Sequence, residues 1–170
     1  MKKCKSLIAV LLAACMLVSC GAKATITIPA DIAKNMSTMD VGTKNMKYES
    51  RTNNSDGSIT YEITVDEQQD ILEKIRDTFD KAVPEMQHDP IKSIYYDKDF
   101  TSFKISTSST SLTIAESVLL IVFYIYGAVY QIYEGKTDPQ IVVEYVNVDS
   151  GNVIKRIDSE EIRKQFTDKF

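Results

Sequence analysis

In this chain of 170 residues, two side chains are candidates for acid–base catalysis, His88 and Glu116. His88 is the only histidine and lies in the predicted loop His88-Asp89-Pro90. Nucleophilic catalysis needs a nucleophile, a base and a group that orients the base, so one histidine would have to serve every proton transfer. We interpret His88 as a solvated loop residue, with a role as a base or a ligand as the alternative.

Glu116 is the second acid–base candidate, because it lies at the predicted start of a long apolar helix. The partial positive charge at a helix N-terminus favours a carboxylate in the first turn. We therefore interpret Glu116 as a first-turn acid. The alternative is a buried catalytic acid, which would make the protein a small hydrolase.

The spacing of residues does not indicate a metal site or a cofactor site. The sequence has no zinc-ligand spacing, glycine-rich phosphate loop, dinucleotide fingerprint or nucleophile elbow. Asn53 to Gly57, and Asp97 with Asp99, offer oxygen ligands in turns but lack the distal bidentate acid of a calcium loop. The sequence predicts no catalytic residue, no metal and no dissociable cofactor.

The most specific chemical signal is a cysteine near the N-terminus. Leu17-Val18-Ser19-Cys20 follows a basic start, Met1–Lys5, and an apolar run, Ser6–Val18, which together have the form of an export signal. The four residues resemble the lipobox of bacterial lipoproteins, in which the cysteine thiol receives a diacylglyceryl group and becomes the new N-terminus. We predict a signal peptide over residues 1–19, a lipidated Cys20 with a short tether over residues 20–24, and anchoring on the extracytoplasmic face of the cell membrane.

Removal of that leader changes the charge of the chain. Residues 20–170 carry 17 basic and 24 acidic side chains, a net charge of −7, and retain one cysteine, so they form no internal disulfide. Residues 20–51 have a net charge of +2 and residues 52–170 a net charge of −9. Without a run of Lys or Arg the chain is a poor candidate for nucleic-acid binding. We expect the early segment to face anionic lipid and the acidic remainder to face away.

The segment Ser117–Tyr133 carries no charged residue and is either a buried helix or a membrane span. Its acidic ends, Glu116 and Glu134, and its four tyrosines favour the buried helix. One aliphatic stripe is expected to face the sheet: Val118, Val122, Ile125, Val129 and Ile132. An adjacent aromatic stripe either packs on the other long helix or lines a groove for a ligand or partner. That candidate face comprises Phe123, Tyr126, Tyr130 and Tyr133.

The elements that must position these residues follow from hydrophobic periodicity, turn residues and helix caps. Residues 25–170 are predicted to form a single α+β domain, an antiparallel sheet built from hairpins with two long helices packed on one face, as a two-layer sandwich. The expected elements begin with a strand at 25–28, then a brief helix and a loop within 30–47. Three hairpins are expected, at 48–52 with 59–64, 91–96 with 100–107 and 141–148 with 152–157. The expected helices are a long one from the capping box at Thr64 to Pro84, a second long one from near 111–113 to 134, and a final one at 158–166.

Several segments are similar to a family of small lipoproteins from Gram-positive bacteria, some of which carry a label linking them to the N-terminal domain of antigen I/II adhesins. The similarity lies in Ile28-Pro29-Ala30, Asp56-Gly57-Ser58-Ile59-Thr60-Tyr61, Asp99-Phe100-Thr101-Ser102-Phe103, Phe123-Tyr124-Ile125-Tyr126-Gly127 with Tyr130, and Val146-Asn147-Val148-Asp149-Ser150-Gly151. The resemblance implies a lipid anchor and a cell-surface setting, and it supplies no catalytic residue.

Together these features predict a membrane-anchored, extracytoplasmic module that binds an envelope protein or a small ligand and has no catalytic activity. The alternative is a carrier of a small molecule or lipid that uses the aromatic face of the second long helix. A small envelope hydrolase is the third hypothesis. The sequence specifies neither the partner nor the oligomeric state.

Overall fold

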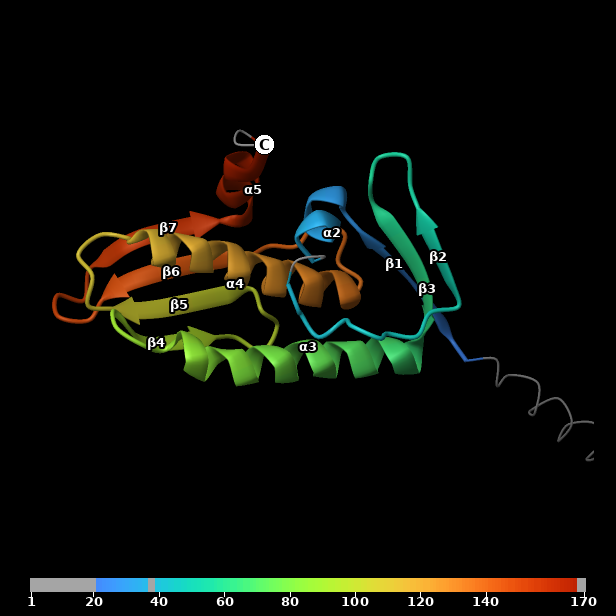
Figure 1. Cartoon of the computed structure of the whole chain (residues 1–170), viewed down its shortest axis with the longest axis horizontal. Helices are drawn as coiled ribbons and strands as arrows, with labels where there is room; N and C mark the ends of the chain where they lie inside the picture. Colours follow the sequence, from blue (N-terminus) through green and yellow to red (C-terminus); the bar gives the residue numbers. More distant parts are fainter. Residues whose placement is uncertain (1–20, 37–38, 168–170) are drawn as a thin grey trace, which may run out of the picture.

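The computed structural model describes residues 21–36 and 39–167, so the predicted leader and Cys20 lie outside the described residues. Within those ranges the chain forms two sheets and four helices (Figure 1). In chain order they are β1 (Lys23–Ile28), α2 (Ala30–Met36), β2 (Ser50–Asn53), β3 (Ile59–Thr64), α3 (Val65–Met86), β4 (Ile91–Tyr96), β5 (Ser102–Thr107), α4 (Ile114–Tyr133), β6 (Val142–Asn147), β7 (Val153–Asp158) and α5 (Ser159–Thr167).

The α+β class and the three predicted hairpins are confirmed, but the prediction of one antiparallel sheet is wrong. β1, β3 and β2 form a three-stranded antiparallel sheet, and β4, β5, β6 and β7 form a separate four-stranded sheet. In the second sheet β5 pairs with β6 in parallel. The physical reason is that α4 carries the chain back along the sheet between these two strands, and such a crossover makes neighbouring strands parallel.

The four-stranded sheet has one covered face and one open face. Helix α4 lies across the covered face with α3 beside it (Figure 1). On the open face the strand registers align Tyr95, Lys104, Glu144 and Arg156 across the four strands. Arg156 donates to the Glu144 carboxylate at 3.1 Å. This alternation of buried and polar side chains is typical of a sheet with helices on one side only.

An aromatic cluster joins the two long helices to the sheet. Phe79 of α3 packs against Tyr126 of α4 at a ring-centroid distance of 4.8 Å and against Phe103 of β5 at 5.7 Å. Phe103 stacks on Phe123 of α4 at 5.2 Å. Gly127 lets α4 lie close to the backbone just before β5, because a Cβ atom there would lie 2.7 Å from the Phe100 carbonyl oxygen.

The segment that follows α2 is a loop, as predicted, and it is fixed to both long helices. Gly42 has φ of 84°, and a Cβ atom there would lie 2.6 Å from the backbone oxygen of Lys74 in α3. The Tyr126 hydroxyl of α4 donates to the Asp40 carbonyl oxygen at 2.9 Å. This loop and α2 therefore cover the C-terminal part of α4, at the end of the molecule where the three-stranded sheet lies (Figure 1).

Helix α3 begins at the predicted Thr64, and α4 begins after Thr113, within the predicted range 111–113. The Thr64 hydroxyl accepts from the Glu67 backbone N–H at 3.1 Å, but the Glu67 carboxylate accepts from the Lys47 backbone N–H, so α3 has half of the predicted capping box. The chain stays helical through Pro84 and ends α3 at Met86, so the proline lies in the last turn.

Candidate functional site

The aromatic stripe of α4 lies in the core. Phe123 and Tyr133 are fully buried and Tyr126 is 4% exposed. Their surroundings are the other long helix and the loop after α2, since Tyr126 packs on Phe79 and the Tyr133 hydroxyl donates to the Met46 sulfur at 3.0 Å. Burial, and then the charge of Asp40, raises the pKa of Tyr126 to about 12. Packing on the other long helix and on the loop after α2 therefore accounts for these residues, whereas Tyr130 of the candidate face lines an indentation of the surface.

The aliphatic stripe of α4 was expected to face the sheet, but it does so along only part of its length. Val118 is 53% exposed, whereas Ile125, Val129 and Ile132 are buried. α4 is long and apolar enough to cross a membrane by length and composition alone, and most of it is buried inside the fold, as in the core helix of a soluble protein.

Glu116 is buried, and its carboxylate accepts hydrogen bonds from three surrounding groups. It accepts from the Thr107 hydroxyl at 2.6 Å, the Ser109 hydroxyl at 3.1 Å and the Thr113 backbone N–H at 2.8 Å, and its own N–H donates to the Thr113 hydroxyl. Burial acts to raise the pKa of Glu116, but the hydrogen bonds from Thr107, Thr113 and Ser109 outweigh it and leave the pKa below the ordinary value. These contacts form a complete capping box, which is the first-turn role expected for this acid.

His88 is exposed in the loop between α3 and β4, and its ring nitrogen Nδ1 lies 3.2 Å from the Asp89 carbonyl oxygen. Its partner is thus a neighbouring backbone atom. Among residues 21–36 and 39–167, no three His, Cys, Asp or Glu side chains gather as metal ligands.

A depression of about 610 Å³ lies between the first half of α3 and the end of α4. We call it the α3–α4 depression. Its walls are mostly polar, with two amides, two acids, two cations, one tyrosine and one leucine. The lining residues are Gln68, Gln69, Leu72, Glu73, Arg76, Tyr130, Glu134 and Lys136.

Arg76 is the most firmly positioned cation in this depression. One of its guanidinium nitrogens, Nη2, donates to the Lys98 carbonyl oxygen at 2.6 Å and to the Tyr130 hydroxyl at 2.7 Å. The guanidinium carbon lies 5.2 Å from the centre of the Tyr130 ring and 5.4 Å from that of Phe100, within the range of cation–π attraction. Toward the other residues that the structure describes, Nε and Nη1 make no hydrogen bond, so they keep donors for a ligand.

The charges around Arg76 cancel. Arg76 and Lys136 supply two positive charges, and Glu73 and Glu134 supply two negative ones, with Lys136 and Glu134 paired at 3.3 Å. The Gln68 amide donates to the Tyr133 carbonyl oxygen at 2.6 Å, which fixes the side chain at the end of α4. Such a surface suits a polar ligand with no large net charge that presents a carboxylate or another acceptor to Arg76.

An aromatic platform for a sugar ring is not open at this depression. Tyr130 is 7% exposed, and its ring stacks on Phe100 at a centroid distance of 4.6 Å. The ring of Tyr130, which the sequence suggested as part of a ligand surface, is therefore covered. Its hydroxyl accepts a hydrogen bond from Arg76 and so positions that side chain.

Sequence reasoning did not identify Arg76, Gln68, Gln69 or Lys136 as site residues. Arg76 lies one residue after buried Ile75 and three before buried Phe79, so the helical pattern puts it at the border between the two faces.

Comparisons of this chain with protein families, curated protein sequences and solved structures find no match.

Proposed function

We propose that this protein is a lipid-anchored, non-catalytic binding module on the outer face of the cell membrane, and that it takes a polar, carboxylate-bearing ligand in the α3–α4 depression. The observation that carries the binding site is Arg76, held by Lys98 and Tyr130 through one nitrogen while its other N–H groups remain available for a ligand. The anchoring rests on the lipobox sequence that ends at Cys20.

The position of Cys20 fits an anchored domain. β1 begins at Lys23, so the folded part starts three residues after the predicted acylated cysteine. An extended chain over that distance spans about 10 Å. The two acyl chains of a diacylglyceryl group would then hold the domain at the membrane, because stable anchoring takes more than one acyl chain.

The two acid–base candidates favour binding over catalysis. Glu116 is used to start α4, and its oxygens accept from Thr107, Ser109 and Thr113. His88 is exposed and lies in the loop after α3, outside the α3–α4 depression. A ligand in the depression would meet the guanidinium, the amides of Gln68 and Gln69, and two carboxylates. These groups recognise a zwitterion by charge-assisted hydrogen bonds, so the ligand class that fits is a short peptide or an amino acid.

Anchoring is tested on the full chain expressed in a bacterium that lipidates its own lipoproteins. Cys20→Ala should abolish incorporation of labelled fatty acid and release the protein from washed membranes. Cys15→Ala is the matched control, because Cys15 lies in the predicted leader and should leave labelling unchanged. Equal labelling of the wild type and Cys20→Ala would refute the anchor.

Ligand binding is tested by NMR titration with the dipeptide Ala-Ala, with its C-terminal amide as the probe that lacks a carboxylate. Ala-Ala should shift the signals of residues around Arg76, and the amide should do so far less. Arg76→Gln should abolish the response and Arg76→Lys should weaken it, because lysine keeps the charge and loses the planar fork. Lys74→Gln, an exposed position on the same helix, should bind like the wild type. Equal responses to both probes would exclude carboxylate recognition.

A further inference from the structure

The two parts of α4 differ in what covers them. In the covered half, residues 123–133, every residue is buried. In the open half, residues 114–122, only Glu116 and Leu120 are buried; Ile114 is 88% exposed and Val118 53% exposed. Leu119, Ile121 and Val122 are half-buried beside them. The surface over the open half therefore presents aliphatic side chains to solvent.

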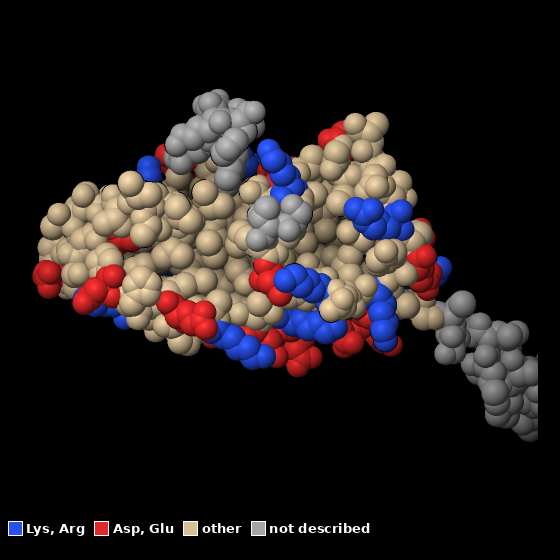
Figure 2. Space-filling model, in the orientation of Figure 1, with Lys and Arg blue, Asp and Glu red and all other residues tan. Residues whose placement is uncertain are grey.

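Figure 2 shows the same face of the molecule from outside. The part over the four-stranded sheet and the open half of α4 is almost free of charged atoms. Lys and Arg atoms gather toward the opposite end of this face, where the three-stranded sheet and the start of β1 lie, and both acidic and basic atoms line the edge formed by α3. α3 itself carries seven acids and three basic residues.

We propose that this face, the open half of α4 together with the basic residues near β1, lies on the anionic lipid surface of the membrane that holds the protein. The inference rests on the proposed anchoring at Cys20. The module would then lie along the membrane with its long axis roughly parallel to the lipid, touching it at two places: the anchored end and the open half of α4.

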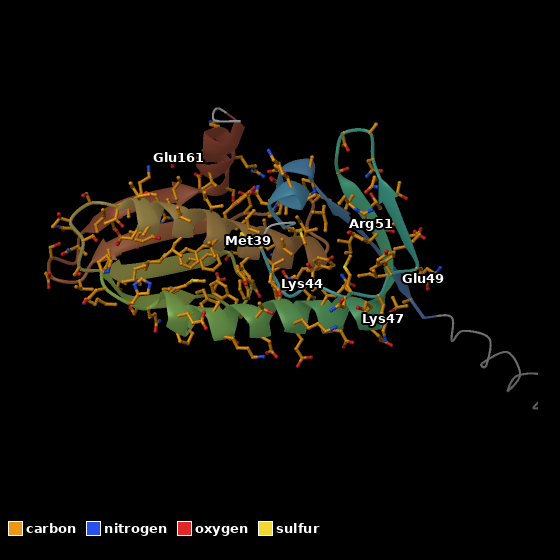
Figure 3. The ribbon with its side chains drawn as sticks, in the orientation of Figure 1. Met39, Lys44, Lys47, Glu49, Arg51 and Glu161 are labelled. Carbon is orange, nitrogen blue, oxygen red and sulfur yellow. The ribbon has the colours of Figure 1, made fainter. Side chains whose placement is uncertain are left out.

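Charge supports lipid as the occupant at the anchored end. Lys23 pairs with Glu49, and Lys44 pairs with Asp40 at 3.1 Å. Lys47 and Arg51 make no salt bridge within the described residues. Arg51 lies on β2 and Lys47 just before it, at the end of the molecule that holds the three-stranded sheet (Figure 3). A basic residue close to an anionic bilayer contributes attraction within about a Debye length of the surface.

The chemistry of the open half also favours lipid over a protein partner. Its exposed and half-buried apolar side chains are Ile, Val, Leu and Ala, with no aromatic residue, methionine or arginine. Protein–protein contacts draw their binding energy mainly from Tyr, Trp and Arg anchors, and interface cores are enriched in aromatic residues and Met. A helix that exposes an aliphatic stripe can lie in the headgroup region with that stripe against the acyl chains.

Because the tether is short, a small contact area is sufficient to orient the domain on the membrane. With about 10 Å of chain between Cys20 and β1, the domain samples a thin layer next to the bilayer, so the second contact forms at a high effective concentration. A patch of a few aliphatic side chains, too small to recruit a free protein, can then fix the orientation of an anchored one.

The experiment uses the absence of tryptophan from the chain. Val118→Trp puts a single fluorescent reporter on the open half, and Tyr95→Trp puts a matched reporter on the opposite, open face of the sheet, where Tyr95 is 67% exposed. The lipidated full-length variants are reconstituted into vesicles of equimolar phosphatidylglycerol and phosphatidylcholine, with or without bromine on the acyl chains. Bromine quenches only tryptophans that reach the acyl region.

We expect strong quenching of Val118→Trp by brominated vesicles and little quenching of Tyr95→Trp. Vesicles of phosphatidylcholine alone, or the double variant Lys47→Gln and Arg51→Gln in the Val118→Trp background, should lower the quenching. Flotation of the same samples reports anchoring separately. Floating protein with equal, weak quenching of both reporters would overturn the membrane contact and leave the anchor intact. Protein that fails to float would overturn both, and quenching of Tyr95→Trp alone would mean that the opposite face meets the lipid.

Discussion

The open and covered halves of α4 have opposite surroundings. Both are mainly apolar, yet every residue of 123–133 is buried, with contacts to α3 and the loop after α2 as well as to the four-stranded sheet, whereas most residues of 114–122 are exposed or half-buried. The covered half contains the aromatic rings and Gly127, and the open half contains aliphatic side chains and the Glu116 capping box. The same helix thus combines a structural core with an exposed apolar surface.

This difference shows how two kinds of stabilisation share one element. The covered half is held by packing, which depends on the shape and volume of each side chain. The open half is held at its start by hydrogen bonds, since Glu116 joins Thr113 of the helix to Thr107 of β5. We therefore expect substitutions in the covered half to act on packing and those in the open half to act through the cap or on the surface.

The largest contrast between the two halves should come from truncating a large side chain in each. Phe123→Ala removes a ring that stacks on Phe103 and is fully buried, and we expect a loss of about 3–5 kcal/mol of stability. Ile114→Ala, at an exposed position, should change stability by no more than about 0.5 kcal/mol. Urea unfolding followed by far-UV circular dichroism measures both; comparable losses would mean that the open half is also part of the core.

A smaller effect is expected from adding one methyl group where the covered half touches the sheet. In Gly127→Ala the new Cβ would lie 2.7 Å from the Phe100 carbonyl oxygen and from a methylene carbon of Ile141. Overpacking costs about 1–3 kcal/mol, and the better helix propensity of alanine offsets about 1 kcal/mol of that. We expect a net loss at the upper end of the resulting range, about 2 kcal/mol, because the Phe100 oxygen is a backbone atom and cannot move aside as a flexible side chain can. Ser117→Ala in the open half is the control, and greater stability of Gly127→Ala would show that α4 can move away from the sheet.

The hairpins of this fold were predictable because their turns are chemically explicit. Gly57 and Gly151 adopt positive φ, as the turn clusters between the paired strands required. The threonine that begins α3 was identified by its spacing to Glu67, whereas the start of α4 was predicted only to within Ser111–Thr113. The division into two sheets was missed because strand pairing between hairpins is non-local. The order strand, helix, strand around α4 carried the information, since a long helix between neighbouring strands is typical of a parallel pair.

The candidate site was much less predictable than the fold. Tyr130 was selected from its position on α4, but the neighbours that give it a role, Arg76 and Phe100, are far away in the chain. The exposure of Val118 also depends on long-range packing, because α2 covers only part of α4. Hydrophobic periodicity indicates which side of a helix is buried. It does not indicate where along the helix a covering element ends.

The cap of the open half provides a third, intermediate test. Glu116→Gln replaces a carboxylate that accepts from Thr107, Ser109 and Thr113 with an amide that cannot accept all of these bonds, and should cost about 1.5 kcal/mol at pH 7. Hydrogen exchange should increase most in the open half. A uniform increase along α4 would show that the two halves open together.

The same variant should change the response to acid. Hydrogen bonds hold the pKa of Glu116 in the folded protein below its ordinary value of 4.5, so the unfolded chain binds the proton first. The stability contributed by the carboxylate is therefore present above about pH 4.5 and is lost as the pH falls through the folded pKa. The wild type should lose stability more steeply than Glu116→Gln below that pH, so the gap between the two should narrow. A constant gap would mean that the carboxylate titrates alike in both states.

The smallest effect on stability should come from a nearly isosteric polar change in the open half. Val118→Thr places a hydroxyl at a half-exposed position, where water satisfies it, and should alter stability by no more than about 0.5 kcal/mol. Val129→Thr makes the same change at a buried position in the covered half and should cost more, about 1–2 kcal/mol, because the hydroxyl must leave water. If Val118 contacts lipid, Val118→Thr should also weaken the contact of the anchored protein with vesicles while Val129→Thr leaves it unchanged. The pair therefore separates a position kept apolar for folding from one kept apolar for a surface, because each variant should fail in only one of the two measurements.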